Sequence, residues 1–263
     1  MIIFDNYLQN CRFIITARGV HMRTIIWFIY FWLYLLLLLP TMKKAQRLKA
    51  DGDQEALDRL LEQKVPTWAN SLMKLAGVKV HVEGRENIPD QPVIFVSNHQ
   101  GYFDIPVLLT VLDKPHPLVS KESIRKIPFI RQWMELLGCV FIDRDNPRQA
   151  VSALNDAVKA LKEKKHSFII FPEGTRSRGG EVGEFKSGGF RVALKNKAPI
   201  VPVVIEGTYK AMEANHMLIH PADVTVQILP PVYTDHLTPE EGKKIGDIVR
   251  EQVVQAKNRL QTV

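Results

Sequence analysis

A histidine and an aspartate lie close together in residues 98–104, which read NHQGYFD. They follow an apolar run typical of a buried strand and precede a run with helical character. A histidine accepts protons near neutral pH, and a carboxylate bonded to its other ring nitrogen fixes the tautomer and stabilises the imidazolium. The spacing therefore predicts that His99 is a general base oriented by Asp104, with Gly101 allowing a tight strand-to-helix turn.

A structural role for the same residues is the competing interpretation. His99 would then be a core histidine, and Asp104 would cap the helix that begins at Ile105 and Pro106. A second polar motif, FPEGTRS at residues 171–177, also follows a strand-like run. Two polar motifs after two strands favour catalysis, because parallel strands present their carboxyl ends at one edge of a sheet.

Four blocks of the sequence carry a resemblance to a known family. They are residues 98–104, 138–144 (GCVFIDR), 171–177 and 200–205 (IVPVVI). In order and spacing they resemble the acyltransferases that acylate glycerol phosphate and lysophosphatidic acid, including the bacterial 1-acyl-sn-glycerol-3-phosphate acyltransferases. The resemblance covers about residues 78–229, and the first and third blocks are its specific part. Gly101 departs from it, since many members carry serine there, but that position is not the base.

The resemblance implies acyl transfer without a covalent intermediate. His99 would deprotonate the acceptor hydroxyl, which attacks the thioester of acyl-CoA or acyl carrier protein; lysophosphatidic acid would give phosphatidic acid. The residues agree, because there is no G-x-S-x-G motif and Cys139 is expected inside a strand. Thioester donors are co-substrates, so no cofactor is expected.

An acceptor that carries phosphate needs cations, and guanidinium groups bind phosphate through paired hydrogen bonds. Arg144 and Arg176 match the arginines of the family, and Lys121 stands where many relatives are basic. At the turn of the third block, Glu173 would hold acceptor hydroxyls or Arg176, and Gly174 would let the backbone approach the ligand. The predicted substrate-binding residues are Lys121, Arg144, Glu173, Gly174, Thr175 and Arg176. A solvated charged loop is the alternative for the arginines of residues 171–178.

Size and composition limit the remaining possibilities. The 263 residues suffice for one α/β domain with an appendage, and the net charge of +7 suits an anionic partner. No RNA-binding or zinc-finger motif is present, so nucleic acid is not expected. Two distant cysteines, Cys11 and Cys139, favour a reducing compartment. The histidines other than His99 lack metal-ligand spacing and are expected on the surface or in loops.

Alternating patterns predict an α/β fold with a mixed, largely parallel sheet flanked by helices. Strands are expected at residues 78–82, 92–97, 117–120, 138–142, 167–171, 199–205 and 224–229. Helices are expected at 53–76, in two pieces separated by Pro66, at 150–161, and from a capping box at 238–241 to 253. Residues 1–76 would form a membrane-anchoring helical region and residues 77–263 the catalytic domain.

Residues 25–39 (IIWFIYFWLYLLLLL) form an uncharged apolar run that favours a lipid environment. A buried helix is one alternative; a cleaved signal peptide is another, but no small-x-small cleavage site follows. Fifteen helical residues cover roughly 23 Å, whereas the hydrocarbon core is about 30 Å thick. Basic residues flank both ends, so we expect a monotopic or re-entrant anchor. The location predicted is the cell membrane, with the catalytic domain facing the cytoplasm; Met22 is a second candidate start.

Several functions remain open on the sequence alone. Other acceptors would use the same motifs: glycerol phosphate, another lysophospholipid or a lyso-ornithine lipid. A membrane-tethered protein that binds anionic lipid without chemistry, or a thioesterase that activates water through His99, would differ in class. A metal hydrolase would need a third ligand near His99 and Asp104, and the sequence offers no residue for that place.

Overall fold

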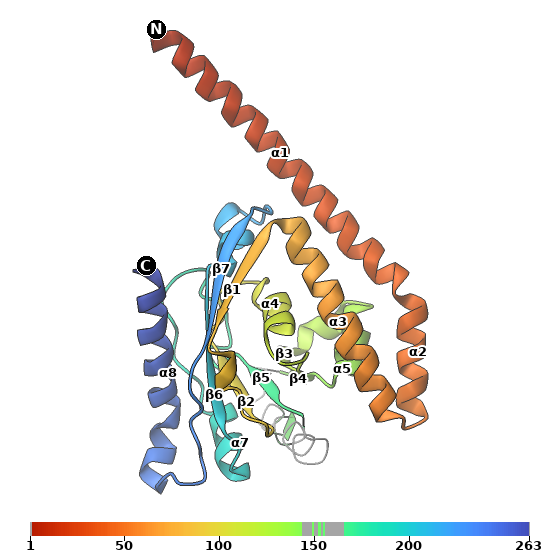
Figure 1. Ribbon diagram of the computed structural model, residues 1–263, viewed down its shortest axis with the longest axis vertical. Helices are drawn as coiled ribbons and strands as arrows, with labels where there is room; N and C mark the ends of the chain where they lie inside the picture. Colours follow the sequence, from red (N-terminus) through yellow and green to blue (C-terminus); the bar gives the residue numbers. More distant parts are fainter. Residues whose placement is uncertain (1, 144–148, 150–151, 154, 156–165, 263) are drawn as a thin grey trace.

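The computed structural model describes residues 2–143, 149, 152, 153, 155 and 166–262. Three helices precede the first strand: α1 (Ile2–Leu37), α2 (Leu39–Ala50) and α3 (Gln54–Ala76). The long α1 extends from one side of the molecule and α2 continues beyond it, after which α3 brings the chain back to β1 (Figure 1). Gly77 ends α3 in the left-handed conformation, with φ of 79°, as its place before the first strand predicts.

The central sheet is mixed and largely parallel, as predicted. Within the described part of the chain, its five strands lie in the order β1-β7-β6-β2-β5, and only the pair β6 and β7 is antiparallel. The strands are β1 (Val78–Glu83), β2 (Ile94–Ser97), β5 (Phe168–Ile170), β6 (Ile200–Glu206) and β7 (Ala222–Ile228). Strands β2, β5 and β6 are buried at every position, which explains their continuous apolar sequences.

A second sheet of two parallel strands continues from the first. It contains β3 (Val119–Lys121) and β4 (Val140–Ile142), and a parallel bridge between Leu118 and Ile169 links it to β5. Cys139 lies directly before β4 and not inside the strand, so that expectation was wrong by one residue. Gly138, which ends α5 (Ile130–Leu137) with φ of 86°, delays the start of the strand.

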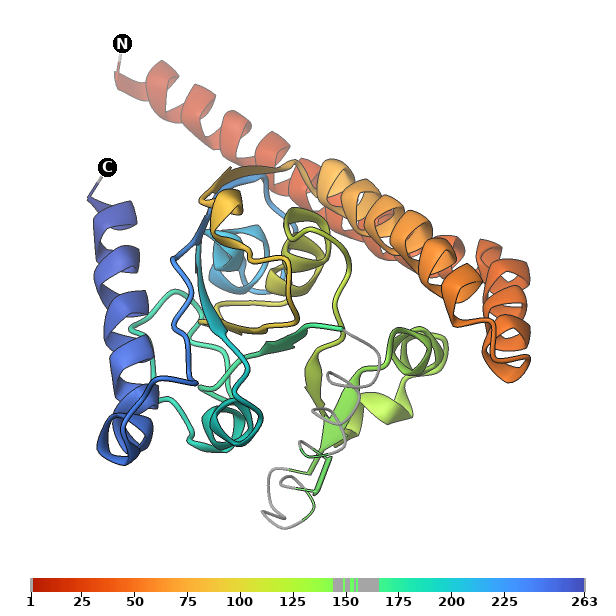
Figure 2. The same cartoon turned by 60° about the horizontal axis from the view of Figure 1, so that its bottom comes forward.

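Helices cover both faces of the central sheet. On one face lie α3 and α4 (Asp104–Val111), and on the other lie α7 (Gly188–Asn196) and α8 (Pro239–Gln261) (Figures 1 and 2). Helix α8 begins with the predicted capping box, in which Thr238 accepts a hydrogen bond from the Glu241 N–H and Pro239 occupies the first turn. The helix expected at residues 150–161 falls largely outside the described residues.

Pro66 does not divide α3, which is one continuous helix, so the prediction of two pieces was wrong. Proline in a helix interior costs about 3 kcal/mol, because it removes a backbone hydrogen bond and crowds the preceding turn. Buried side chains lie on both sides of it: Leu57 and Leu61 before, Ala69 and Leu72 after. Their packing offsets the cost of the proline.

The first helix packs along its side against the rest of the protein. Trp27 belongs to the main core and donates from Nε1 to the Leu72 carbonyl over 3.0 Å, and Thr24 Oγ1 accepts from the Ile219 N–H over 2.8 Å. The segment Gly19–Leu37 is long and apolar enough to cross a membrane, yet only 17% of it is buried in the protein. Its free face is therefore apolar and exposed, while its other face is fixed to α3 and to the loop before β7.

Candidate active site

His99 and Asp104 meet directly after β2, at the start of α4. His99 Nδ1 lies 2.6 Å from Asp104 Oδ2, and its ring stacks on Phe171 with the centroids 4.2 Å apart. The side chain of His99 is 16% exposed, whereas that of Asp104 is fully buried. With Nδ1 held by the carboxylate, Nε2 is the nitrogen that can take a proton from a bound molecule.

Asp104 is held by more than the histidine. Its Oδ2 accepts the backbone N–H groups of Gln100 at 2.6 Å and Gly101 at 2.9 Å, and its Oδ1 accepts the hydroxyl of Thr208. These donors satisfy the hydrogen-bonding capacity of a fully buried side chain. Asp104 is therefore suited to orient His99 and to stabilise its imidazolium, which goes beyond the helix cap of the structural alternative.

The two polar motifs are bonded to each other. Glu173 Oε1 accepts the His99 N–H at 2.7 Å, and Glu173 Oε2 accepts the Gly183 N–H at 2.9 Å. The Ser177 N–H also donates to the His99 carbonyl over 2.8 Å. Burial raises the pKa of the Glu173 carboxyl, and both N–H donors oppose that rise. Glu173 thus joins the 98–104 and 171–177 segments, as the shared edge of β2 and β5 requires.

The polar side chains beside His99 anchor its turn to β6. The side chain of Asn98, directly after β2, donates to the Ile205 carbonyl over 2.9 Å and accepts from the Ile205 N–H over 2.8 Å. These bonds continue the pairing with β6 beyond the last residue of β2. Gln100 is fully buried, donates to Glu206 over 2.9 Å and accepts from the Gly207 N–H over 2.9 Å. The end of β6 therefore sets the path of the chain through His99.

Arg176 lies beside this turn with its guanidinium partly open. It pairs with Glu213 over 3.3 Å and lies 3.8 Å above the ring of Tyr102. The sequence left Glu173 to hold either acceptor hydroxyls or Arg176; among the described residues, the acidic partner of Arg176 is Glu213. Gly174 adopts φ of 68°, which a side chain would strain, and Thr175 is exposed at the same turn.

Lys121 and Arg144 are the other two cations predicted to bind substrate. Lys121 is exposed at the end of β3, next to Ser120, which lines a large cavity. Arg144 lies outside the described residues, directly after the segment that contains β4. Both remain predictions as substrate-binding residues.

An apolar cavity of about 480 Å³ starts beside the histidine turn. Tyr102 and Phe103 line it at that end, and side chains of α1, α3 and α5 line the remainder, among them Phe31, Trp68 and Met134. Its walls are almost entirely hydrocarbon and aromatic, a lining that suits a long alkyl chain. Cys139 also lines it, but burial raises the pKa of the thiol to about 12, so a reactive thiolate is not available.

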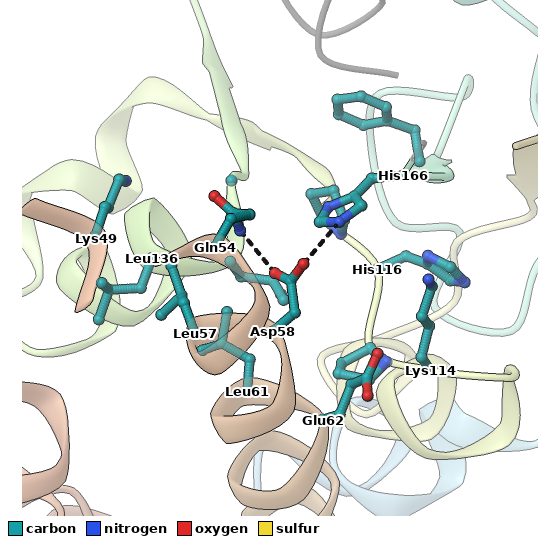
Figure 3. Close-up of a pocket in the computed structure, with 15 residues that line it drawn as sticks. Lys49, Gln54, Leu57, Asp58, Leu61, Glu62, Lys114, His116, Leu136 and His166 are labelled. Carbon is teal, nitrogen blue, oxygen red and sulfur yellow. Dashed lines mark hydrogen bonds and ion pairs between the residues drawn. The ribbon is translucent and has the colours of Figure 1, made fainter. Parts of the chain in front are cut away.

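A smaller cavity of about 80 Å³ lies at the amino ends of the strands, where Phe168 begins β5 (Figure 3). Asp58 of α3 joins Gln54 and His166 there, over 2.7 and 3.3 Å. Because His99 follows the carboxyl end of β2, this cavity belongs to the opposite edge of the sheet. His116 lies in the loop between α4 and β3, which agrees with the expectation of a surface or loop position, but it is only 1% exposed. It bonds to Asp113 over 2.7 Å and packs on the Phe95 ring.

Comparison with known proteins agrees with this geometry. The fold and its paired motifs are those of an acyltransferase: the Acyltransferase family matches residues 79–206. The crystal structure of the 1-acyl-sn-glycerophosphate (LPA) acyltransferase PlsC from Thermotoga maritima is similar, with a TM-score of 0.77 and 29% identity. That match covers 93% of this chain and 98% of the Thermotoga chain.

Curated sequences narrow the assignment. The 1-acyl-sn-glycerol-3-phosphate acyltransferase of Borreliella burgdorferi is 33% identical over 190 residues, which are 72% of this chain and 74% of that protein. The enzyme of the same name from Saccharomyces cerevisiae is 34% identical over 186 residues, 70% of this chain and 61% of the yeast protein. The chain belongs to the 1-acyl-sn-glycerol-3-phosphate acyltransferase family. It spans about half to three fifths of the yeast and chloroplast relatives.

Several residues that build the site escaped the sequence analysis. Three of them are acidic or hydroxyl side chains at or after the end of β6: Glu206, Thr208 and Glu213. Thr208 lies three residues after the end of the fourth block (200–205), and that proximity was the one local signal for it. Glu213 lies in a short 3-10 helix, η4 (Glu213–Asn215), and no motif surrounds it.

Proposed function

We propose that this protein transfers a fatty acyl group from an acyl thioester to the sn-2 hydroxyl of lysophosphatidic acid and so forms phosphatidic acid. One observation carries the proposal: the His99–Asp104 pair is held against the 171–177 loop, at the end of an apolar cavity. The names of the relatives support the same reaction.

In this mechanism His99 Nε2 accepts the proton of the acceptor hydroxyl. The oxygen attacks the thioester carbonyl, the carbon–sulfur bond breaks, and the proton on His99 passes to the leaving thiolate. Four donors hold the two oxygens of Asp104, so that its carboxyl group keeps the imidazole oriented and stabilises the imidazolium that forms. Acyl-CoA and acyl carrier protein are the proposed donors.

Cationic side chains bind the phosphate of the acceptor and so position its hydroxyl near His99. Arg176 supplies guanidinium N–H groups for a phosphate, and Lys121 and Arg144 are the further cations of the proposal. The cavity beside Tyr102 takes an alkyl chain, since burial of each methylene group contributes about 0.8 kcal/mol. Phosphate and chain would thus bind next to each other at Tyr102, whose ring faces Arg176 and which also lines the cavity.

Acyl transfer by the purified protein in detergent tests the proposal. Lysophosphatidic acid, glycerol 3-phosphate and lysophosphatidylcholine are offered separately with palmitoyl- or oleoyl-CoA, and the lipid product and the free thiol are measured. We expect phosphatidic acid from lysophosphatidic acid, and little product from the acceptor that lacks an exposed phosphate monoester.

Other outcomes would contradict the proposal in distinct ways. Release of free thiol without acylated lipid would identify a thioesterase. Preference for glycerol 3-phosphate or lysophosphatidylcholine would replace the acceptor. If neither acyl-CoA nor acyl carrier protein as donor gives product, the protein binds lipid without catalysis.

We also propose that α1 lies in one leaflet of the cell membrane, with the catalytic domain at the cytoplasmic surface. The apolar side chains exposed on α1 are Met22, Ile25, Ile26, Phe28, Ile29, Trp32, Leu33, Leu36 and Leu37. Bonds from Thr24 and Trp27 hold the opposite side of this helix to the catalytic domain. A full crossing would draw that domain into lipid, whereas an interfacial position leaves it in water.

Cysteine labelling from each side of the membrane tests this position. Cys11 is replaced by serine, and single cysteines are placed at Arg18 and at Lys44, on the two flanks of the apolar segment. Both should react with a membrane-impermeant maleimide from the cytoplasmic side alone. Cys139, which is half-buried and has a thiol pKa raised to about 12, should contribute little background.

Lys243→Cys provides the control, because Lys243 is exposed on α8 in the catalytic domain. It should be labelled from the same side as the two flanks. Labelling of Arg18→Cys and Lys44→Cys from opposite sides would show that α1 spans the membrane.

A further inference from the structure

We infer that Glu213 is a positioning residue that holds Arg176 and the turn before α4 in the geometry that receives the acceptor phosphate. The inference deepens the proposed function and rests on it, since the phosphate is that of lysophosphatidic acid. Glu213 lies beyond residues 79–206, the part of the chain that matches the family.

The contacts of Glu213 join two parts of the site. Its Oε1 accepts the backbone N–H of Tyr102 over 2.7 Å and lies 3.3 Å from Arg176 Nη1. The Glu213 side chain is 2% exposed, whereas that of Arg176 is 26% exposed. The carboxylate is therefore the fixed, buried partner, and the guanidinium keeps an open side.

Tyr102 holds the guanidinium from a second direction. The Arg176 Cζ atom lies 3.8 Å from the centroid of the Tyr102 ring, and the tyrosine is half exposed. One face of the guanidinium is thus covered by the ring, and one of its amino groups is bonded to the carboxylate. A guanidinium carries five N–H donors, so others remain for a phosphate at the exposed side.

The position of the Glu213 carboxylate leaves no space for a side chain at residue 101, which is glycine. A Cβ atom at Gly101 would lie 2.5 Å from Glu213 Oε2, so the carboxylate fills the volume of a side chain at position 101. The backbone of Gly101 does not adopt the left-handed conformation, and the tight turn alone does not explain the glycine. Gly101 and Glu213 therefore form a coupled pair beside His99.

The charges agree with a positioning role. Burial raises the pKa of the Glu213 carboxyl, and the Tyr102 N–H and Arg176 oppose that rise. Glu213 Oε2 is buried without a hydrogen-bond partner among the described residues. Because burial without full hydrogen bonding costs free energy, Arg176 and the Tyr102 N–H are what keep the carboxylate in this place.

Steady-state kinetics of Glu213→Gln test the inference. The amide keeps the shape but loses the charge that orients Arg176. The KM for lysophosphatidic acid should rise about ten-fold, as loss of one charge-assisted hydrogen bond predicts, with kcat within about two-fold of the unaltered protein. Monoacylglycerol, which lacks the phosphate, should be used as poorly as before. The matched control is Glu251→Gln, an exposed glutamate on α8.

A binding measurement independent of turnover accompanies the kinetics. Lysophosphatidic acid is titrated calorimetrically in detergent against His99→Ala protein with and without Glu213→Gln, and the second change should weaken binding about ten-fold. Gly101→Ala should weaken binding too, and by less when Glu213→Ala is also present, because the clash is removed. Circular dichroism monitors folding of each variant.

The outcomes separate the inference from the proposed function. If lysophosphatidic acid is preferred over monoacylglycerol and Glu213→Gln leaves both KM and affinity unchanged, the inference alone is overturned. An equal loss of kcat for both acceptors would show a merely structural role and overturn it as well. If the unaltered protein does not distinguish the two acceptors, the proposed acceptor fails, and the phosphate-positioning role fails with it.

Discussion

Replacement of His99 by alanine should lower kcat for acyl transfer to lysophosphatidic acid by about 10²- to 10⁴-fold, the contribution of a positioned general base. The hydroxyl of the acceptor is a poor nucleophile until its proton is removed, and His99 is the basic group that Asp104 holds at the site. The KM for both substrates should change little, because Arg176 and the apolar cavity remain. Single-turnover kinetics with radiolabelled donor measure the effect.

The fold should survive this replacement. Asp104 keeps three donors without the histidine: the backbone N–H groups of Gln100 and Gly101 and the hydroxyl of Thr208. The carboxylate is therefore not left unpaired in the interior. His81→Ala is the matched control, since His81 is an exposed histidine on β1. Transfer at the unaltered rate by His99→Ala would exclude His99 as the base.

His99 is oriented by Asp104, and this explains why the site forms at the start of α4. The carboxylate belongs to the first residue of that helix and accepts the two N–H groups that precede it. A negative charge is stabilised near the amino end of a helix, where backbone N–H groups are free. The same hydrogen bonds that end β2 and begin α4 therefore orient the histidine.

The sequence was sufficient to predict the meeting of the two motifs. Each follows a continuously apolar strand, and β2 pairs in parallel with β5, so their carboxyl ends lie together. The hydrogen bond from Ser177 to the carbonyl of His99 is the direct result. The largely parallel pairing of the sheet was predictable for a similar reason, because strands that alternate with helices usually pair in parallel.

Isolated charged residues were not predictable. Glu206, Glu213 and Lys257 are buried or nearly so, yet a single charged residue in a sequence usually belongs to a solvated surface. They come close to the turn after β2 because the end of β6, η4 and α8 all pack near it in the folded protein. The continuity of α3 through Pro66 was not predicted for a similar reason, because tertiary packing decides it. Packing likewise decides that His116, a loop residue as expected, is buried.

Glu173 shows that the hydrogen-bond partners of a residue cannot be predicted from the sequence even when its motif is identified. Its type and its place at the turn indicated a role in the site, but the sequence could not decide which group it binds. In the structure its two oxygens accept N–H groups from His99 and Gly183, which join three segments of the chain. The partner of a carboxylate depends on the path of the loops, and local spacing does not contain that path.

The buried lysine of α8 is where the largest effect on stability is expected. Lys257 is 4% exposed, donates to the Gly180 carbonyl over 3.0 Å and lies 3.9 Å from Glu206 Oε2. Glu206 in turn accepts from Gln100 over 2.9 Å and from Gln261 over 3.2 Å. The C-terminal helix is therefore linked through Glu206 to the residue next to His99.

Lys257→Met should lower the free energy of unfolding by about 3 to 5 kcal/mol, because it leaves the buried carboxylate of Glu206 without its cation. Urea denaturation in detergent, followed by tryptophan fluorescence, measures the loss. Lys243→Met, an exposed lysine of the same helix, should change stability by less than about 0.5 kcal/mol. Equal stability of the two variants would mean that the pair with Glu206 is not significant.

The double variant Lys257→Met with Glu206→Gln separates charge from packing. Removing both charges eliminates the unpaired carboxylate, so the double variant should be more stable than Lys257→Met alone. Its activity should nevertheless stay below that of the unaltered protein, because the hydrogen bond to the Gly180 carbonyl, at the end of the loop that carries Arg176, is not restored. A lysine on the last helix would then stabilise the fold through its charge and the active-site loop through its hydrogen bond.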